Sequence, residues 1–117
     1  MIVTDVQKLL SGINNVFAYH LPIEYKMDKT FILLTEVYSV RSVAGSNVTT
    51  AKTEEVQMTI TYDDETEPDE YEDKINELLE SNNFVQISGY HQYDPEIAQF
   101  QAILKYQKTK YLRKESD

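Results

Sequence analysis

The sequence contains no cysteine, and this absence excludes several kinds of site at once. Without a thiol there is no disulfide framework, no thiolate metal site and no cysteine nucleophile. The absence also fits synthesis in a reducing, intracellular compartment, because disulfides persist in oxidising ones. We therefore expect a fold held by a hydrophobic core, which a chain of 117 residues can form as a single domain.

Glycine is almost as scarce, and Gly12, Gly45 and Gly89 stand far apart from one another. A loop that holds phosphate groups needs several glycines ahead of a helix, because its backbone N–H groups must approach the phosphate closely. The sequence therefore predicts no nucleotide-binding loop. Nine tyrosines against three glycines and three prolines favour strands joined by few tight turns.

Positive charge is also in short supply, with 11 lysines and arginines against 20 aspartates and glutamates and a net charge of −9. Such a surface repels nucleic acid phosphates and anionic lipid headgroups. The longest apolar run, residues 31–34, is far shorter than the roughly 20 residues that span a bilayer. The N-terminus lacks the basic and apolar segments of a signal peptide. We expect no nucleic acid and no membrane as partners.

The spacing of apolar residues predicts two helices and five strands. Val6 and Leu9 begin a helical stripe with Thr4 as its N-cap, and a second stripe follows Pro68, which suits the first turn of a helix. Alternation between apolar and polar residues predicts the strands. The expected elements are a helix over 4–12, strands over 16–19, 30–40 and 56–62, a helix from 68 to 82, and strands over 84–90 and 99–108.

This order, α-β-β-β-α-β-β, predicts an α+β fold with a mostly antiparallel or mixed sheet and two helices packed on one face. Residues 30–40 carry apolar side chains on both faces, which favours a central strand covered on both sides. A turn is expected at 93–96. We place one domain at residues 1–110 and expect the charged residues 111–117 to fray.

One stretch between two of the predicted strands is small and polar, with no charge before its last residue. A loop of this length in a compact domain is usually functional or disordered. We predict a long, mobile hairpin loop here. We call it the predicted assembly loop, after the role that the family resemblance described below implies for it, and its residues are Ser42, Val43, Ala44, Gly45, Ser46, Asn47, Val48, Thr49, Thr50 and Lys52.

Acidic residues are concentrated between Asp63 and Asp73. Several carboxylates close together can bind a divalent cation, but the spacing lacks the glycine and terminal glutamate of an EF-hand loop. The favoured interpretation is a solvated loop whose charges stabilise the start of the following helix. A small acidic module that responds to metal or mimics nucleic acid stays open as a second hypothesis.

The two histidines, His20 and His91, belong to no motif for catalysis or metal binding. No nucleophile is paired with a base in the sequence, and a two-histidine metal site could arise only through the tertiary fold. We therefore expect a protein that is not an enzyme and has no catalytic residues, no metal ligands and no cofactor.

The order and spacing of these features resemble a family of small proteins from the tails of long-tailed phages and prophages of Gram-positive bacteria, of the tail-terminator or tail-completion (minor tail) type. The resemblance extends over nearly the whole chain, in pattern and size and not in a chemical signature. Beyond the two helices and the polar loop, it depends on residues 16–22, 29–37, 55–62, 93–96 and 99–108.

The resemblance implies a structural protein that forms a hexameric ring on the end of the tail tube and joins the tube to the head. Its implied partners are other copies of itself, the major tail protein and a head-completion protein. The implied locations are the bacterial host cytoplasm during assembly and the virion tail afterwards. In such proteins a long loop between two strands reaches toward a neighbouring subunit or the tube.

Overall fold

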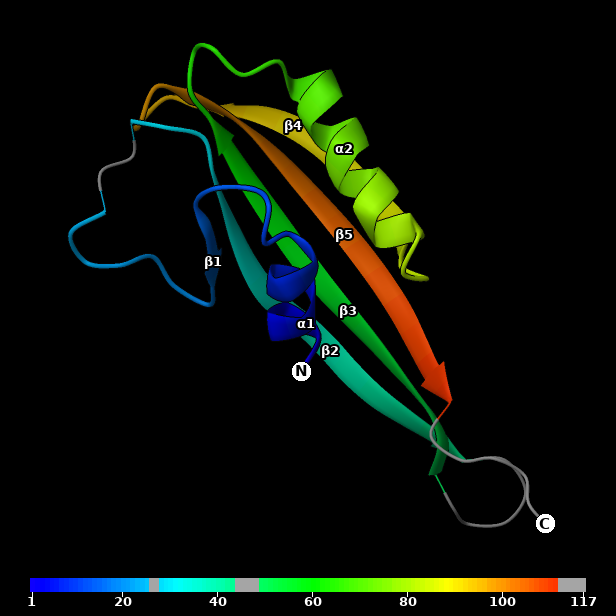
Figure 1. Cartoon of the computed structure of the whole chain (residues 1–117). Coiled ribbons are helices and arrows are strands. Elements are labelled where there is room, and N and C mark those ends of the chain that lie inside the picture. Colours follow the sequence, from blue (N-terminus) through cyan, green and yellow to red (C-terminus); the bar gives the residue numbers. More distant parts are fainter. Residues whose placement is uncertain (26–27, 44–48, 112–117) are drawn as a thin grey trace.

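A computed structural model of the chain describes residues 1–25, 28–43 and 49–111. The predicted order of helices and strands and the α+β class are confirmed (Figure 1). The elements are α1 (Ile2–Leu9), β1 (Val16–Ala18), β2 (Phe31–Val43), β3 (Thr49–Tyr62), α2 (Pro68–Glu80), β4 (Val85–Asp94) and β5 (Gln99–Tyr111).

All five strands form one mixed sheet in the order β1-β2-β3-β5-β4. Strand β1 runs parallel to β2, and every other neighbouring pair is antiparallel. The central strand is β3, so the prediction that residues 30–40 form the central strand is wrong. The apolar residues on both faces of β2 have another cause, because Phe31 packs edge-on against Tyr25, outside the main core.

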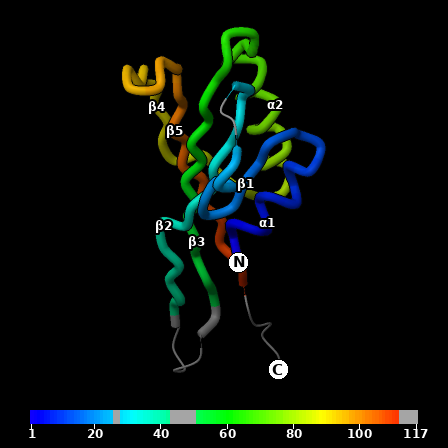
Figure 2. The backbone as a smooth tube through the Cα atoms, turned by 90° about the vertical axis from the view of Figure 1, so that its left-hand side faces the viewer, coloured from blue at the N-terminus to red at the C-terminus, as the bar shows by residue number. Residues whose placement is uncertain are grey.

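Both helices pack on the same face of the sheet, as the sequence predicts (Figures 1 and 2). In the views, α1 lies over β2 and β3, and α2 lies beside β5 and β4. Burial of apolar area between the two layers is the main stabilising term. The fully buried side chains between them include Val3, Val6, Ile32, Leu34, Val56, Met58, Ile60, Ile75, Leu79, Ala102 and Tyr106.

The helix ends follow local capping rules in one case and depart from them in the other. Helix α2 begins at Pro68 as predicted, and the Glu67 carboxylate accepts a hydrogen bond from the Asp69 N–H at 2.9 Å. After α2 the chain turns through Asn83, whose φ of 68° is the left-handed conformation that asparagine tolerates. The prediction that Thr4 caps α1 is wrong, because the N-cap is Met1.

Most strands are longer than the sequence pattern indicates. Strand β4 continues to Asp94, so the turn lies at 95–98, two residues later than the predicted 93–96. Strand β5 continues to Tyr111, one residue beyond the predicted domain end. The molecule is elongated, 55 × 28 × 23 Å, and β2, β3 and β5 extend together past the two helices (Figure 1).

Candidate assembly surface

The sheet has a second face that no helix of the described residues covers (Figure 2). Side chains alternate between the two faces of a strand, so Ile103 points away from the helices while Ala102 and Leu104 lie in the core. Thr59 and Tyr90 are aligned with Ile103 and share its side. We call this side the uncovered face. Over residues 55–61 of β3 and the aligned part of β5, it consists of Glu55, Gln57, Thr59, Thr61, Gln101, Ile103, Lys105 and Gln107.

Neutral polar side chains cross-link the strands on the uncovered face. The Gln92 amide donates to the Gln101 carbonyl at 3.1 Å, and the Gln101 amide donates to the Thr61 hydroxyl at 3.1 Å. The Gln107 amide donates to the Tyr38 hydroxyl at 2.6 Å. Hydrogen bonds between neighbouring strands hold the side chains in place. The result is an ordered, largely uncharged surface on a strongly acidic protein.

Strands β2 and β4, which lie on the outer sides of β3 and β5, also expose large apolar side chains. Val40 on β2 is 54% exposed, while Val85 and Tyr90 on β4 are 59% and 56% exposed. Val37 and Ile87 lie at bulges, where the register between strands shifts by one residue, and both are exposed too. Exposed apolar groups gathered on the outer strands of a sheet are typical of a surface that meets a partner.

An aromatic cluster closes one corner of the sheet. The Tyr25 ring packs edge-on against Phe17 and Phe31, with ring centroids 4.9 and 5.3 Å away. Burial and the nearby charge of Asp28 raise the pKa of Tyr25. Within the described residues its buried hydroxyl has no hydrogen-bond partner. This corner stabilises the start of β2 without a helix above it.

The structure places much of the predicted assembly loop in strands. Ser42 and Val43 end β2, and Thr49, Thr50 and Lys52 begin β3, so the expectation of a loop over 42–52 is wrong at both ends. Backbone pairing joins Val43 to Thr49 across the hairpin. The physical reason is that the β-branched residues Val43, Thr49 and Thr50 suit the extended backbone of a strand.

The remaining predicted loop residues lie outside the described residues. They are Ala44, Gly45, Ser46, Asn47 and Val48. The assembly role of the whole segment stays a prediction.

Charged side chains tie the base of this hairpin to α1. The Lys110 ammonium group lies 3.2 Å from Asp5 and 3.7 Å from Glu54, and Lys52 lies 3.8 Å from Glu54. The hydrogen bond to Asp5 raises the pKa of Lys110. Glu54 is 1% exposed, and two lysines compensate its buried charge. The strands are therefore held at the point where they pass beyond the helix.

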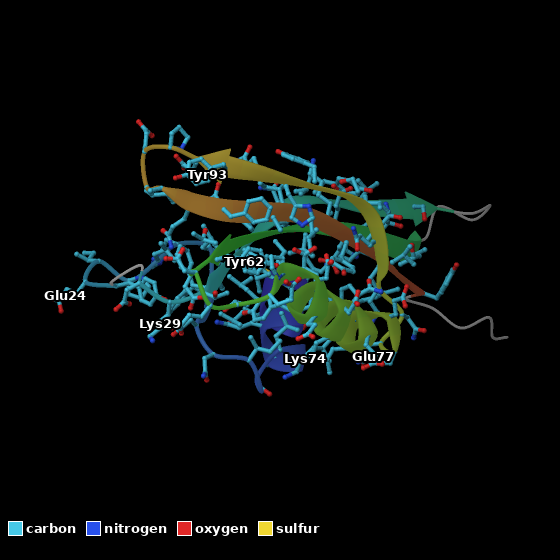
Figure 3. The ribbon with its side chains drawn as sticks, turned by 90° about the horizontal axis from the view of Figure 1, so that it is seen from above. Glu24, Lys29, Tyr62, Lys74, Glu77 and Tyr93 are labelled. Atoms are coloured by element: carbon cyan, nitrogen blue, oxygen red, sulfur yellow. The ribbon has the colours of Figure 1, made fainter. Side chains whose placement is uncertain are left out.

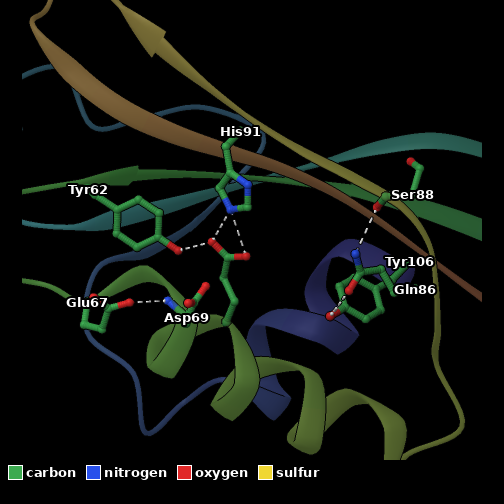
Figure 4. Close-up of polar contacts among 8 residues, drawn as sticks. Tyr62, Glu67, Asp69, Gln86, Ser88, His91 and Tyr106 are labelled. Atoms are coloured by element: carbon green, nitrogen blue, oxygen red, sulfur yellow. Dashed lines mark hydrogen bonds and ion pairs between the residues drawn. The ribbon is translucent and has the colours of Figure 1, made fainter.

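On the helix-covered face, two polar side chains meet at one carboxylate (Figure 4). The Tyr62 hydroxyl donates to Glu72 at 2.5 Å, and His91 Nε2 lies 2.9 and 3.1 Å from the two Glu72 oxygens. The His91 ring stacks on Phe100 with ring centroids 5.5 Å apart. The arrangement joins α2 to β3 and β4. Sequence reasoning missed it, because 19 residues separate Glu72 from His91 and no motif connects them.

The acidic run serves the local structure around the start of α2. One Asp63 oxygen accepts hydrogen bonds from the Glu65 and Thr66 N–H groups, and the other accepts one from the Thr30 N–H. Burial alone would raise the pKa of Asp63, but these hydrogen bonds and one from the Thr66 hydroxyl lower it to about 2. Among the described residues no group of three histidines or carboxylates is arranged to hold a metal ion.

The two histidines are in different surroundings. His20 is exposed, and its Nδ1 lies 3.4 Å from the carbonyl oxygen of Leu21, whereas His91 contacts Glu72. They share no partner, so the described contacts give no two-histidine site.

A cleft of about 540 Å³ lies between the end of α1 and the start of α2. Lys29 and Lys74 line it together with Asn14 and Asn15, and Figure 3 shows both lysines on the side of the sheet that carries the helices. Asp63 also lines the cleft and offsets part of the positive charge. The cleft therefore has mixed charge.

No protein-family model matches this chain, and no curated protein matches it. In the described residues, neither helix is long and apolar enough to cross a membrane.

Proposed function

We propose that this chain is a structural protein that assembles with copies of itself into a ring, as a tail terminator of a long-tailed phage or prophage. The observation that supports assembly is the uncovered face, flanked by exposed apolar side chains on both outer strands. A folded monomer gains nothing from exposing Val85 and Tyr90 to water, whereas burial against a partner stabilises the complex.

The surface has the composition of an interface more than that of a catalytic cleft. Its core strands carry threonine and glutamine side chains already bonded to one another, so few groups would lose hydrogen bonds when water is displaced. Tyrosine and other apolar groups at its margins supply contact area at low conformational cost.

The resemblance in the sequence supplies the finer part of the proposal. A ring at the end of a tail tube, contacts with the major tail protein and a head-completion protein, and a place in the virion tail all come from that likeness. The elongated shape and the projecting strands β2 and β3 suit a subunit that reaches toward neighbours on more than one side.

The acidic regulator is the weaker candidate. Its motivating feature was the run from Asp63 to Asp73, and three carboxylates of that run, Asp63, Glu67 and Glu72, accept hydrogen bonds within the fold. These carboxylates stabilise the chain's own backbone and side chains and leave fewer groups to bind a cation.

The first test is the mass of the purified protein by light scattering over a concentration series, with electron microscopy of any large species. We expect a closed ring near six subunits, or a monomer that converts to one on concentration or on addition of tail tubes. A matched pair of variants links the result to the surface. Tyr90→Lys on the uncovered face is expected to weaken assembly at least tenfold, because it brings a charge into the interface.

The control is Ser11→Lys, which adds the same charge at an exposed position after α1. Ser11 belongs neither to the uncovered face nor to β2 or β4, so its replacement is expected to leave assembly intact. A strict monomer under every condition, including with tail tubes present, contradicts the proposed function.

A further inference from the structure

The sheet has two long edges that are open. Strand β4 forms one edge over its whole length, and all of its residues except Asp94 are exposed. At the other edge β1 pairs only with residues 32–34 of β2. Residues 35–41 of β2 therefore have no neighbouring strand on that side within the described residues. An open strand edge presents N–H and C=O groups that another strand can bind.

Both edges carry few of the features that usually block pairing between molecules. Natural edges are protected by proline, charged side chains, bulges or covering elements. Residues 85–93 contain no charged group apart from the titratable His91, and residues 35–41 contain one glutamate and one arginine, Glu36 and Arg41. A single bulge interrupts each edge. On a chain of net charge −9, these two edges are where two copies can approach with little repulsion.

We propose that β4 of one copy pairs antiparallel with residues 35–41 of β2 of the next copy, so that the sheet continues from subunit to subunit. The inference rests on the proposed function, since it describes how the ring is joined. Three antiparallel steps separate β2 from β4, so the two strands run in opposite directions within one copy. Copies placed side by side in the same orientation therefore bring antiparallel strands together.

Because the two joined edges are different, the contact is heterologous. A heterologous contact repeated with rotation produces a closed ring, whereas a contact of a surface with itself stops at a dimer. The geometry of this chain thus favours rings over two-fold dimers.

We place Tyr90 of one copy opposite Tyr38 of the next, because this register gives a shift along the strands that suits a closed ring. Tyr90 is aligned through β5 and β3 with Leu33. Pairing Tyr90 with Tyr38 of the next copy shifts the strands by five residues relative to this alignment. The bulge at Val37 accounts for one of the five, so the remaining shift of four residues is about 13 Å along the strand. Four strands per copy are about 19 Å wide. The ratio of the shift along the strands to the width of one copy gives a strand tilt of about 35° to the ring axis. This value is at the lower end of the tilts found in closed sheets.

The same register keeps the two faces distinct. Tyr90 and Tyr38 both belong to the uncovered face, since Tyr38 bonds to Gln107 there. Ser88 then lies opposite Val40, and both side chains point to that face. Cross-strand aromatic pairs such as Tyr90 with Tyr38 stabilise antiparallel strands.

Disulfide cross-linking tests the register in the full chain, which contains no cysteine of its own. The test variant carries Ser88→Cys and Val40→Cys, two substitutions at solvent-exposed positions. Within one copy three strand spacings alone put about 14 Å between these positions, and the offset along the strands adds to this, so they are beyond the reach of a disulfide. Mild oxidation of assembled protein is expected to produce a ladder of covalent oligomers that ends at the ring size. The control variant, Gln92→Cys with Val40→Cys, is four residues out of register and is expected to give at least tenfold less cross-linking.

The outcomes separate this inference from the proposed function. Rings seen by light scattering without a ladder, or with equal ladders from both variants, overturn the edge pairing and leave the ring intact. Absence of rings together with absence of a ladder, for variants whose circular dichroism matches the parent, overturns both. A ladder that stops at the dimer contradicts the heterologous contact, because a head-to-tail joint extends beyond two copies.

Discussion

Tyr62 brings a hydroxyl group onto the helix-covered face, where burial and the hydrogen bond to Glu72 raise its pKa. The tyrosine is 3% exposed, so this hydroxyl can find no replacement partner in water. Glu72 also accepts from His91, and its side chain is mostly buried. The Glu72 carboxylate therefore accepts hydrogen bonds from two strands, and its removal leaves both the Tyr62 hydroxyl and the His91 ring without this partner.

We expect Glu72→Ala to lower the free energy of unfolding by about 1 to 3 kcal/mol, because it leaves the buried Tyr62 hydroxyl unpaired. Urea denaturation followed by circular dichroism measures the change. Glu77→Ala is the control, since Glu77 is exposed on the same helix and is expected to change stability by less than about 0.5 kcal/mol. Equal losses for the two variants would show that Glu72 acts only through helix propensity.

Asp63 makes stability depend on acid pH. Its pKa is about 2 in the folded chain against about 3.9 in an unfolded one, so the unfolded state binds protons first as the pH falls. The stabilisation is fully present above pH 4 and is lost as the pH falls toward 2. Asp63→Asn is expected to be less stable than the parent at pH 7, with a difference that shrinks between pH 4 and pH 2.

Urea denaturation at pH 7, 4 and 2.5 measures that difference. Asp64→Asn, at the exposed neighbouring position, serves as the control for the change of net charge. A gap between parent and Asp63→Asn that is constant over this range would argue against the role of these hydrogen bonds.

The sequence could indicate the kind of residue at these positions but not their partners. The carboxylates ahead of Pro68 predicted a stabilised helix start, and Glu67 does cap that helix. The contact of His91 with Glu72 depends on how β4 lies against α2, which is a property of the tertiary fold. No spacing in the chain encodes that contact.

At the scale of the element, β4 is shaped by Gly89. A Cβ atom at this position would lie 2.6 Å from the Gln86 amide nitrogen and 2.9 Å from a Leu104 methyl group. Gln86 in turn accepts a hydrogen bond from the buried Tyr106 hydroxyl at 3.3 Å. The missing side chain lets the strand lie close to the core beside its bulge.

We expect Gly89→Ala to destabilise the fold by about 1 to 3 kcal/mol, because the added methyl group must displace Leu104 or Gln86. Gly12→Ala is the matched control, since no heavy atom lies within 4 Å of the Cβ position there. Thermal unfolding compares the melting temperatures of the two variants with that of the parent. Similar melting temperatures would mean that the neighbouring side chains move aside at little cost.

The types of elements were predictable, but several of their ends were not. Alternation of Val56, Met58 and Ile60 identified β3, because one side of this strand is buried. The first residues of β3 escaped detection, since residues 49–52 show no alternation of apolar and polar residues that would mark a strand. Thr4 has the chemistry of a helix cap, yet α1 begins at Ile2, because burial of Ile2 and Val3 in the core stabilises the earlier start.

At the scale of the whole molecule, the order of the strands was the main point that the pattern could not supply. The apolar run in β2 indicated a central strand, and β3 holds that place because β5 returns between β3 and β4. Strands with the same apolar periodicity can occupy different positions in a sheet, and contacts between residues distant in sequence decide which position each strand takes. The uncovered face was foreseeable in part, since Gln57, Thr59 and Thr61 alternate with the core residues of β3.

The position of β5 in the sheet also sets when the chain can fold during its synthesis. The central strand β3 acquires one neighbour, β2, early, but its other neighbour is complete only after Tyr111 has been made. Until then β3 lacks one of its two neighbours and the apolar stripe of α2 lacks the core side chains of β5, and contacts distant in sequence form slowly. The chain therefore exposes an unpaired edge of β3 to other newly made chains until β5 has been made, which favours aggregation of incompletely folded copies.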